Sequence, residues 1–404
     1  MDTTMRADPG HAGAEPPTPF GGGRFEVLDG WRGVCAAMVV LFHIPALGGL
    51  PELPLIRGGY LFVDFFFVLS GFVITHAYYA RLRGAADARR FVVSRLKRTY
   101  PLHLAMLLAF LAFELLVLKT KGSAEAFQGG NSVYALVMNL LQLHAFGTVD
   151  QLGWNYPSWS ISAEFGAYVL FAAGMLLLGR RVPWLFAGVV LFATPFLLWR
   201  VGELDTTVDF GWLRCLLGFS CGALLRIFAW PPREASAPRC RVSWTAAEVA
   251  MLAAVGTFVV AAGHTPLSIA APFVFTFAVY VFAHEAGSVS AILRWRLFAF
   301  LGLISYSIYL THAFVISRVI NVATVVEGRL GLALMMERAD GSKAFGPSPL
   351  VENGAAVVIL VATIIVSAVT WRLVERPFQK LSLSKLGRRN RPDASQPSAT
   401  PSAA

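Results

Sequence analysis

Long apolar runs recur along most of the chain, and short polar segments separate them. Ten of these runs reach the roughly 20 residues that a helix needs to cross a bilayer. They lie near residues 31–50, 60–79, 101–118, 161–179, 183–201, 211–229, 245–262, 268–285, 297–320 and 350–371. The pattern predicts an all-α fold, a polytopic integral membrane bundle of about ten transmembrane helices. Within the runs, Gly71, Pro195, Gly218 and Pro272 indicate close helix packing or kinks.

An eleventh apolar segment, 133–146, is short and is interrupted by Asn139, Gln142 and His144. The positive-inside rule decides how it is interpreted. With ten spans and both termini in the cytoplasm, 25 of the 34 Lys and Arg residues fall on the cytoplasmic side. An eleventh span would move the Arg180–Arg181 pair and the basic cluster at 233–241 outside. We therefore predict that 133–146 is interfacial or re-entrant and that 321–349 is a long external segment.

The composition agrees with a membrane protein. The chain is 56% hydrophobic and only 14% charged, which excludes an ordinary soluble domain. Its net charge of +10 is explained by basic cytoplasmic loops, so we expect a lipid bilayer and no nucleic acid as partner. Residues 1–24 and 381–404 have little to bury and are predicted to be disordered cytoplasmic tails around a domain at 25–380. Neither a metal site nor a disulfide is expected, because four cysteines lack metal-ligand spacing: Cys35, Cys215, Cys221 and Cys240.

Ionisable side chains at bilayer depth are costly, and this makes them functional candidates. Arg32 and His43 are eleven residues apart in the first run, which places them on one helix face about 16 Å apart along the axis. Their ordinary roles would be a snorkelling arginine and a histidine bonded to a backbone carbonyl. The second run carries Asp64 and Ser70. Asp64 is expected near the external head groups or paired with a cation, for which Arg32, His43 and Arg57 are the candidates.

Two further segments carry polar residues that need a reason. The basic loop 81–98, which ends at Arg98, orients the chain in the membrane or binds an anionic cytosolic ligand. Before the fourth run, Trp154, Tyr156 and Trp159 are typical of an aromatic belt. Glu164 enters the same run, and membrane anchoring does not require a carboxylate there.

A polar stripe occurs in the ninth run. Ser305, Tyr309 and His312 stand at i, i+4 and i+7 and so share one helical face. Such a stripe predicts a lined cavity or interhelical hydrogen bonds, and the sequence leaves both open.

Taken together, these motifs resemble the bacterial membrane acyltransferase-3 family, which O-acylates surface and secreted carbohydrates and other small acceptors. One departure is Phe165, at a position where members often carry a second carboxylate, so no role for a second acid is transferred. The resemblance covers nearly the whole core and rests on six stretches in this order: LDGWRGVCAAMVVLFH with its Arg-x10-His motif, VDFFFVLSGFVIT, RLKRTYPLHL, WSISAEF, SYSIYLTH and VERPF.

The resemblance implies an enzyme of the bacterial inner membrane that uses cytoplasmic acyl-CoA, for which acetyl-CoA is the first choice and a succinyl donor the second. No permanently bound cofactor is implied. The acceptor would be a hydroxyl of a carbohydrate or small molecule at or beyond the membrane. The alternative is a proton-coupled transporter or flippase, for which buried His, Asp and Glu residues would form a relay. We find no inverted repeat of the kind that transporters favour.

Acyl transfer from a thioester to an alcohol needs a base, stabilisation of the oxyanion and a grip on the CoA phosphates. His43 is the candidate base, since an ordinary imidazole pKa of about 6.5 leaves it largely neutral. Arg32 is expected to bind the donor, orient the histidine or stabilise the oxyanion, and a transient acyl-histidine stays open. Candidates for substrate binding or support are Asp64, Ser70, Arg98, Trp159, Ser160, Glu164, Tyr309 and His312.

Overall fold

The computed structural model describes residues 24–230, 241–339 and 341–379. Residues 1–23 and 380–404, which include nearly all of the predicted tails, lie outside the described residues, as does Cys240. The long helices are α1 (Glu26–Phe42), α3 (Phe62–Tyr78), α4 (Ala85–Lys121), α6 (Trp159–Leu178), α7 (Val182–Arg200), α8 (Gly211–Leu224), α9 (Arg241–Ala262), α10 (Ala271–Ala283), α13 (Ser305–Leu330) and α14 (Pro349–Thr370).

Shorter elements connect these helices. The short α-helices are α2 (Pro54–Arg57), α5 (Val133–Leu140), α11 (Ser288–Leu293) and α12 (Arg296–Leu303). The 3₁₀ helices are η1 (Leu50–Glu52), η2 (Gly58–Leu61), η3 (Gly129–Asn131), η4 (Tyr156–Ser158), η5 (Gly179–Arg181) and η8 (Pro266–Ala270). Two π-helical segments are η6 (Leu225–Ala229) and η9 (Trp371–Glu375). In the part of the chain that the structure describes, the only strands are β1 (Met335–Glu337) and β2 (Lys343–Phe345), an antiparallel hairpin.

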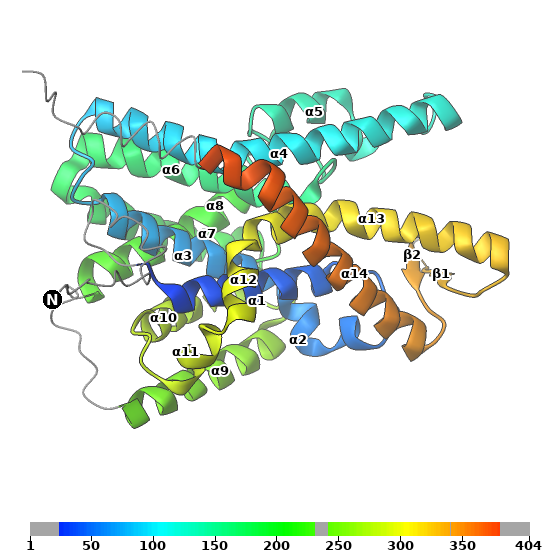
Figure 1. Ribbon diagram of the computed structural model, residues 1–404. Helices are drawn as coiled ribbons and strands as arrows, with labels where there is room; N and C mark the ends of the chain where they lie inside the picture. The colour runs from blue at the N-terminus through cyan, green and yellow to red at the C-terminus, as the bar shows by residue number, and fades with distance from the viewer. Residues whose placement is uncertain (1–23, 231–240, 340, 380–404) are drawn as a thin grey trace, which may run out of the picture.

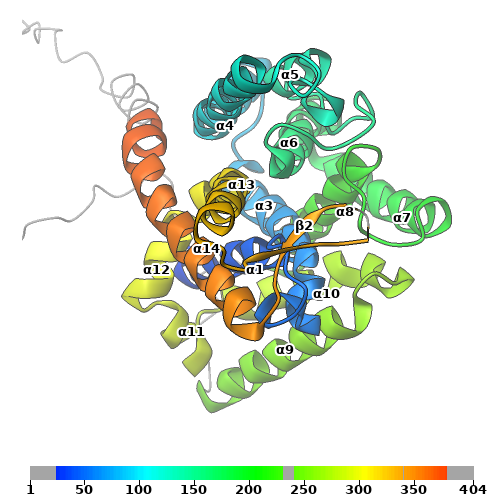
Figure 2. The same cartoon turned by 90° about the vertical axis from the view of Figure 1, so that its right-hand side faces the viewer.

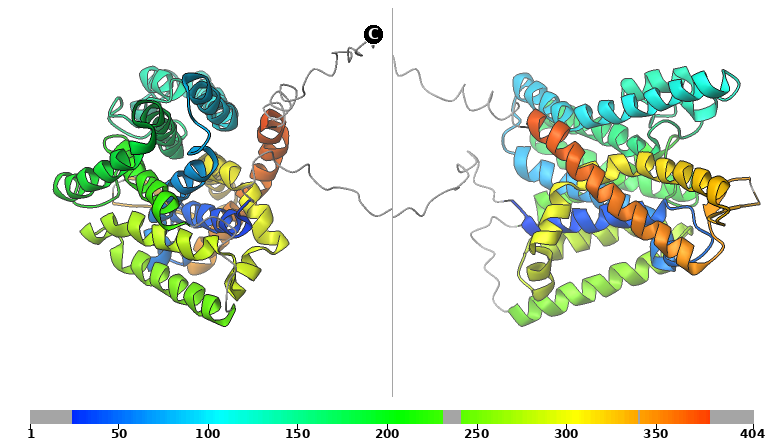
Figure 3. Two further views of the ribbon diagram at one scale, coloured as in Figure 1. Left: turned by 90° about the vertical axis from the view of Figure 1, so that its left-hand side faces the viewer. Right: turned by 45° about the vertical axis from the view of Figure 1, so that its right-hand side comes forward.

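The helices form one elongated bundle (Figure 1). The start of α1 lies at one end, and the ends of α4 and α13 lie with the β-hairpin at the other. In the view along the bundle, α1 and α3 are central, with α4, α5 and α6 on one side and α9 on the opposite side (Figure 2). Helix α14 runs obliquely across the outside of this arrangement (Figure 3, right).

Eight helical stretches among the described residues are long and apolar enough to cross a membrane. Each of the ten predicted runs overlaps a helix, but α1 has only 17 residues and is not among the eight. One 45-residue stretch, Tyr156–Arg200, contains both α6 and α7. The helical membrane class is therefore confirmed, whereas the count of ten and the cytoplasmic placement of the termini stay predictions.

The predicted span at 297–320 is wrong as a single helix. The chain forms α12 and α13 instead, with a break at Ile304. At the end of α12, a Cβ on Gly302 would lie 2.2 Å from the Asp29 carbonyl oxygen, so only glycine allows α12 to approach α1 this closely. The Ser305 hydroxyl then donates to the Gly302 carbonyl (2.9 Å) and starts α13 in a new direction.

Helix α13 continues to Leu330, into the segment predicted as external at 321–349, and the hairpin follows it. The external placement of this segment stays a prediction. The 133–146 segment contains α5, which has eight residues and is about 12 Å long. That length is too short for a span. Whether the segment is re-entrant or interfacial stays a prediction.

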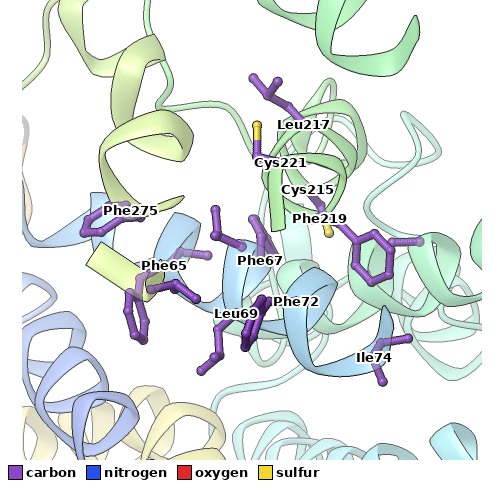
Figure 4. Packing of buried hydrophobic residues seen from close by; sticks show 14 of the residues in the cluster. Phe65, Phe67, Leu69, Phe72, Ile74, Cys215, Leu217, Phe219, Cys221 and Phe275 are labelled. Atoms are coloured by element: carbon purple, nitrogen blue, oxygen red, sulfur yellow. The ribbon is translucent and has the colours of Figure 1, made fainter. Parts of the chain in front are cut away.

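The core is densest where α3 packs against α8. Phenylalanines of α3 meet cysteine, leucine and phenylalanine side chains of α8, with Phe275 of α10 beside them (Figure 4). A Cβ on Gly71 would lie 1.9 Å from the Phe219 carbonyl oxygen, and one on Gly222 would lie 1.9 Å from the Val68 carbonyl oxygen. The close packing predicted for Gly71 is therefore confirmed. Cys35, Cys215 and Cys221 are buried free thiols.

The outer surface of the bundle is apolar. Leu177, Trp184, Trp199 and Leu350 are 78–84% exposed. A soluble protein rarely leaves so many large apolar side chains in water. Hydrocarbon chains of a bilayer are the solvent that this surface fits.

Candidate active site

Two histidines from distant parts of the chain meet inside the bundle. His43 ends α1 and His312 lies in α13, and their ring centroids are 4.9 Å apart. Tyr156, the first residue of η4, lies against both rings, with centroids 5.0 Å from His43 and 5.8 Å from His312. We call these three residues, with Tyr309 and Ser160, the histidine cluster.

Backbone contacts fix the proton on each imidazole. The Nδ1 atom of His43 is 2.8 Å from the Val39 carbonyl oxygen, and that of His312 is 2.7 Å from the Tyr309 carbonyl oxygen. A carbonyl oxygen only accepts, so each Nδ1 carries the proton, and in the neutral ring each Nε2 has a lone pair. His312 is fully buried, and its Nε2 has no hydrogen-bond partner among the described residues. The cluster therefore contains two unprotonated Nε2 atoms that can accept a proton.

Ser160 and Tyr309 support this pair. The Ser160 hydroxyl lies 2.7 Å from the Tyr309 hydroxyl oxygen and 3.1 Å from the Pro157 carbonyl oxygen. The adjacent Asn155 amide donates to the Leu310 carbonyl (3.0 Å) and so fixes the segment before α6 to α13. The structure thus brings together four of the candidates from the sequence: His43, Ser160, Tyr309 and His312.

Arg32 lies at the other end of α1, about 16 Å from His43 along the helix axis. Its guanidinium is 3.4 Å from the Asp29 carboxylate and interacts with the charge of Glu375 in η9. Exposed Arg98 of α4 interacts with the same carboxylate. Arg95, one turn earlier in α4, is half-buried and stacks over the Tyr78 ring at 5.5 Å. We call Arg32, Arg95 and Arg98 the arginine cluster.

Glu164 and Ser70 interact with tyrosines of α6 and α13. The Ser70 and Tyr168 hydroxyl oxygens are 3.2 Å apart. Glu164 is half-buried and interacts with Tyr168 and with Tyr306 of α13. Ser70 does not contact the histidine cluster, whereas Glu164 also interacts electrostatically with Tyr309 of that cluster.

Asp64 has a partner that the sequence does not indicate. Its carboxylate accepts from Arg214 of α8 at 2.7 Å, and both side chains are fully buried. None of the three suggested partners is correct, because Arg32 contacts Asp29, Arg57 pairs with Glu52, and His43 bonds to Val39. Trp159 lies over the Arg214 guanidinium at 5.4 Å. It is 6% exposed, so it packs on this ion pair and does not form an interfacial belt.

The missed residues are Tyr156, Arg214 and Glu375. Arg214 is the only charged residue in its run before Arg226, and that isolation was a usable signal. Glu375 stands inside the VERPF stretch. Tyr156 gave no signal beyond its aromatic neighbours. No group of three or more potential metal-binding side chains occurs in the described ranges.

Comparison with known proteins identifies the family of this chain. A family model described as an acyltransferase domain matches residues 25–372. The chain is 29% identical over 302 residues to a protein of Komagataeibacter xylinus that is named as a membrane-bound transacylase. The aligned residues cover 70% of this chain and 71% of that protein. No solved structure matches the chain.

Two other relatives carry related names. An acyltransferase of Streptomyces mycarofaciens is 32% identical over 165 residues, 39% of this chain and 37% of that protein. A Staphylococcus aureus protein named as an O-acetyltransferase is 23% identical over 394 residues, 90% of this chain. The match spans only 58% of the length of the Staphylococcus protein.

Proposed function

Because the chain belongs to the acyltransferase-3 family, we propose that it transfers an acetyl group from cytoplasmic acetyl-CoA to a hydroxyl of a carbohydrate, such as a surface polysaccharide or a lipid-linked sugar, at the bacterial inner membrane. Family membership makes it a membrane acyltransferase rather than the transporter or flippase that was the alternative. The observation that carries the proposal is the pair of imidazoles, His43 and His312, each with an unprotonated Nε2 inside a membrane bundle.

His43 is the base in this proposal. It ends α1, its Nδ1 proton is held by Val39, and no other group of the described chain bonds to its Nε2. The acceptor hydroxyl would donate to this Nε2 and be activated as a nucleophile. His312 has the same tautomer and lies 4.9 Å away, so it is a second acceptor for a sugar hydroxyl. Only one of the two is expected to be protonated at a time, because adjacent like charges repel.

The bonds balance without a further reactant. The acceptor oxygen forms a C–O bond to the thioester carbonyl carbon while its proton passes to His43 Nε2. The tetrahedral oxyanion then collapses, the C–S bond breaks, and the CoA thiolate takes the proton from His43. A transient acyl-histidine would start from the same Nε2 atom and would differ only in forming an N–C bond first.

The arginine cluster is the proposed donor site. CoA carries phosphates, and guanidinium groups bind phosphate in a planar, bidentate manner. Arg32 and Arg98 both interact electrostatically with the Glu375 carboxylate without forming an ion pair with it. The pantetheine arm would extend along α1 toward His43. Three residues that interact with one another are proposed to support this arm: Ser70, Glu164 and Tyr168.

The test is acetyl transfer by membranes from a strain that carries the wild-type chain, a variant or no copy. Membranes receive labelled acetyl-CoA or succinyl-CoA, and mass spectrometry measures acylated surface glycans. His43→Ala should lower transfer at least about a hundredfold, which is the usual contribution of a general base. Arg32→Gln should mainly raise the KM for the donor, and the surface variant His264→Gln should match wild type. Transfer by His43→Ala at a sizeable fraction of the wild-type rate would refute the base, and no labelled glycan would refute the acceptor class.

A further inference from the structure

An open pocket of about 400 Å³ lies beside the histidine cluster, between α4, α13 and the segment before α6. Its lining residues include parts of α4 and α13, and the C-terminal ends of these two helices lie away from the start of α1 (Figure 1). Phe110 and Phe113 of α4, Trp154 and Tyr156 contribute aromatic side chains. Arg318 of α13 contributes the only cation among the lining residues.

The described residues do not provide a hydrogen-bond acceptor for two of the Arg318 guanidinium nitrogens. The guanidinium of Arg318 stacks on Phe113 and lies 5.1 Å from the Phe314 ring centroid. The Nε and Nη1 atoms are buried and have no hydrogen-bond partner among the described residues. No carboxylate of the described residues forms a salt bridge with it. Buried N–H groups without partners cost free energy, so an acceptor that entered the pocket would relieve that cost.

The nearby carboxylate of Glu114 does not fill this role. Its Oε1 accepts from the Phe127 backbone N–H (2.6 Å), and its Oε2 accepts from the Asn131 amide (3.4 Å). Glu114 is 9% exposed and fixes the loop that forms the pocket wall. Glu114 therefore lines the pocket without forming a salt bridge to Arg318.

Tyr156 connects the pocket to the reacting groups. It lines the pocket, and its ring centroid is 5.0 Å from that of His43. Arg318 is six residues beyond His312, which corresponds to about 9 Å along α13 and a turn of about 120° toward α4. A ligand held by Arg318 would thus reach His43 past Tyr156 while its anionic group stayed in the pocket.

We propose that this pocket, the Arg318 pocket, is the acceptor subsite and selects a carbohydrate that carries an oxyanion, either a carboxylate or a phosphate. The inference rests on the proposed acyl transfer to a sugar. Aromatic rings offer flat apolar surfaces to the C–H faces of sugar rings, and a guanidinium binds carboxylate and phosphate in the same bidentate geometry.

The experiment measures binding to the detergent-purified full chain without acyl-CoA, so a failure of acyl transfer leaves this result unaffected. The probes are trigalacturonate, glucose 6-phosphate, neutral maltotriose and, as a lipid head-group fragment, glycerol 3-phosphate. At least one anionic sugar should bind about tenfold or more tightly than maltotriose. Arg318→Gln should weaken that binding about tenfold to a hundredfold, as expected for a lost charge-assisted pair. The matched control is Arg329→Gln, an exposed arginine farther along α13, which should bind as wild type does.

If Arg318→Gln fails to fold, Arg318→Lys keeps the charge and loses the planar fork, and it should still weaken the anionic sugar while leaving maltotriose unchanged. Equal affinity for neutral and anionic sugars would overturn the proposal. So would an anionic affinity that both Arg318 variants retain. Arg318-dependent binding of glycerol 3-phosphate alone would assign the pocket to a lipid head group and would also overturn it.

Discussion

The Asp64–Arg214 ion pair is an energetically costly arrangement inside the bundle. Both side chains are fully buried, and two guanidinium nitrogens contact the carboxylate at 2.7–3.2 Å. The same guanidinium donates to the Tyr60 and Thr206 carbonyls at 3.0 and 3.4 Å. Desolvating two charges is costly, and this network of bonds offsets the cost only while both partners are present.

Asp64→Asn should therefore destabilise the protein by about 3–5 kcal/mol, because it leaves Arg214 charged and buried without compensation. The matched control is Glu125→Gln, which breaks the exposed pair of Lys121 and Glu125 and should cost at most about 1 kcal/mol. Thermal unfolding of both purified variants in the same detergent measures the difference. Equal shifts in the unfolding temperature would mean that the ion pair is not a structural element.

At the residue scale, the sequence identifies candidate functional residues more reliably than it identifies their contact partners. His43, Tyr309 and His312 stand out because polar groups are costly in apolar runs, and the structure brings them together. Asp64 stands out for the same reason, but its partner is 150 positions away. Finding Arg214 requires knowing that α3 packs on α8, and hydropathy does not contain that information.

Helix contacts depend on glycine where the backbones approach most closely. Gly71 of α3 faces the Phe219 carbonyl of α8, and a Cβ there would come within 1.9 Å of backbone oxygen. Unlike a flexible side chain, a backbone carbonyl moves only if the helix moves. The α3–α8 interface therefore tolerates no side chain at this position.

Gly71→Ala should destabilise the protein by about 1–3 kcal/mol or more, the range typical of overpacking. Gly256→Ala in α9 is the control, since no atom lies within 4 Å of its added Cβ. In a helix interior this control should be neutral or stabilising by up to about 1 kcal/mol. Chemical or thermal unfolding in detergent compares the two. A Gly71→Ala protein as stable as the control would contradict the close approach of α3 and α8.

At the scale of elements, hydropathy locates apolar helices but not their breaks. The run at 297–320 is predominantly apolar despite its polar stripe, so it predicts one span. Its division into α12 and α13 depends on the contact of Gly302 with α1, a tertiary effect. Likewise, the hairpin after α13 pairs by backbone hydrogen bonds and by the bridge of Phe345 to Ala46, which follows α1.

At the scale of the whole molecule, α1 connects the proposed donor site with the proposed acceptor site. Arg32 near its start belongs to the arginine cluster, and His43 at its end belongs to the histidine cluster beside the Arg318 pocket. A donor from one side of the membrane and an acceptor from the other would meet at the end of α1. This arrangement requires that the two ends of the bundle face opposite aqueous compartments.

Cysteine labelling tests that requirement. Ala86→Cys lies at the start of α4, Lys343→Cys lies in β2, and both positions are exposed. They are introduced separately into a chain with Cys240→Ser, where Cys35, Cys215 and Cys221 are buried. In the ten-span arrangement, an odd number of crossings separates positions 86 and 343. A membrane-impermeant maleimide should therefore label Lys343→Cys in intact cells and Ala86→Cys only after permeabilisation. Labelling of both from the same side would require an even number of crossings, and it would place the arginine cluster and the Arg318 pocket in one compartment.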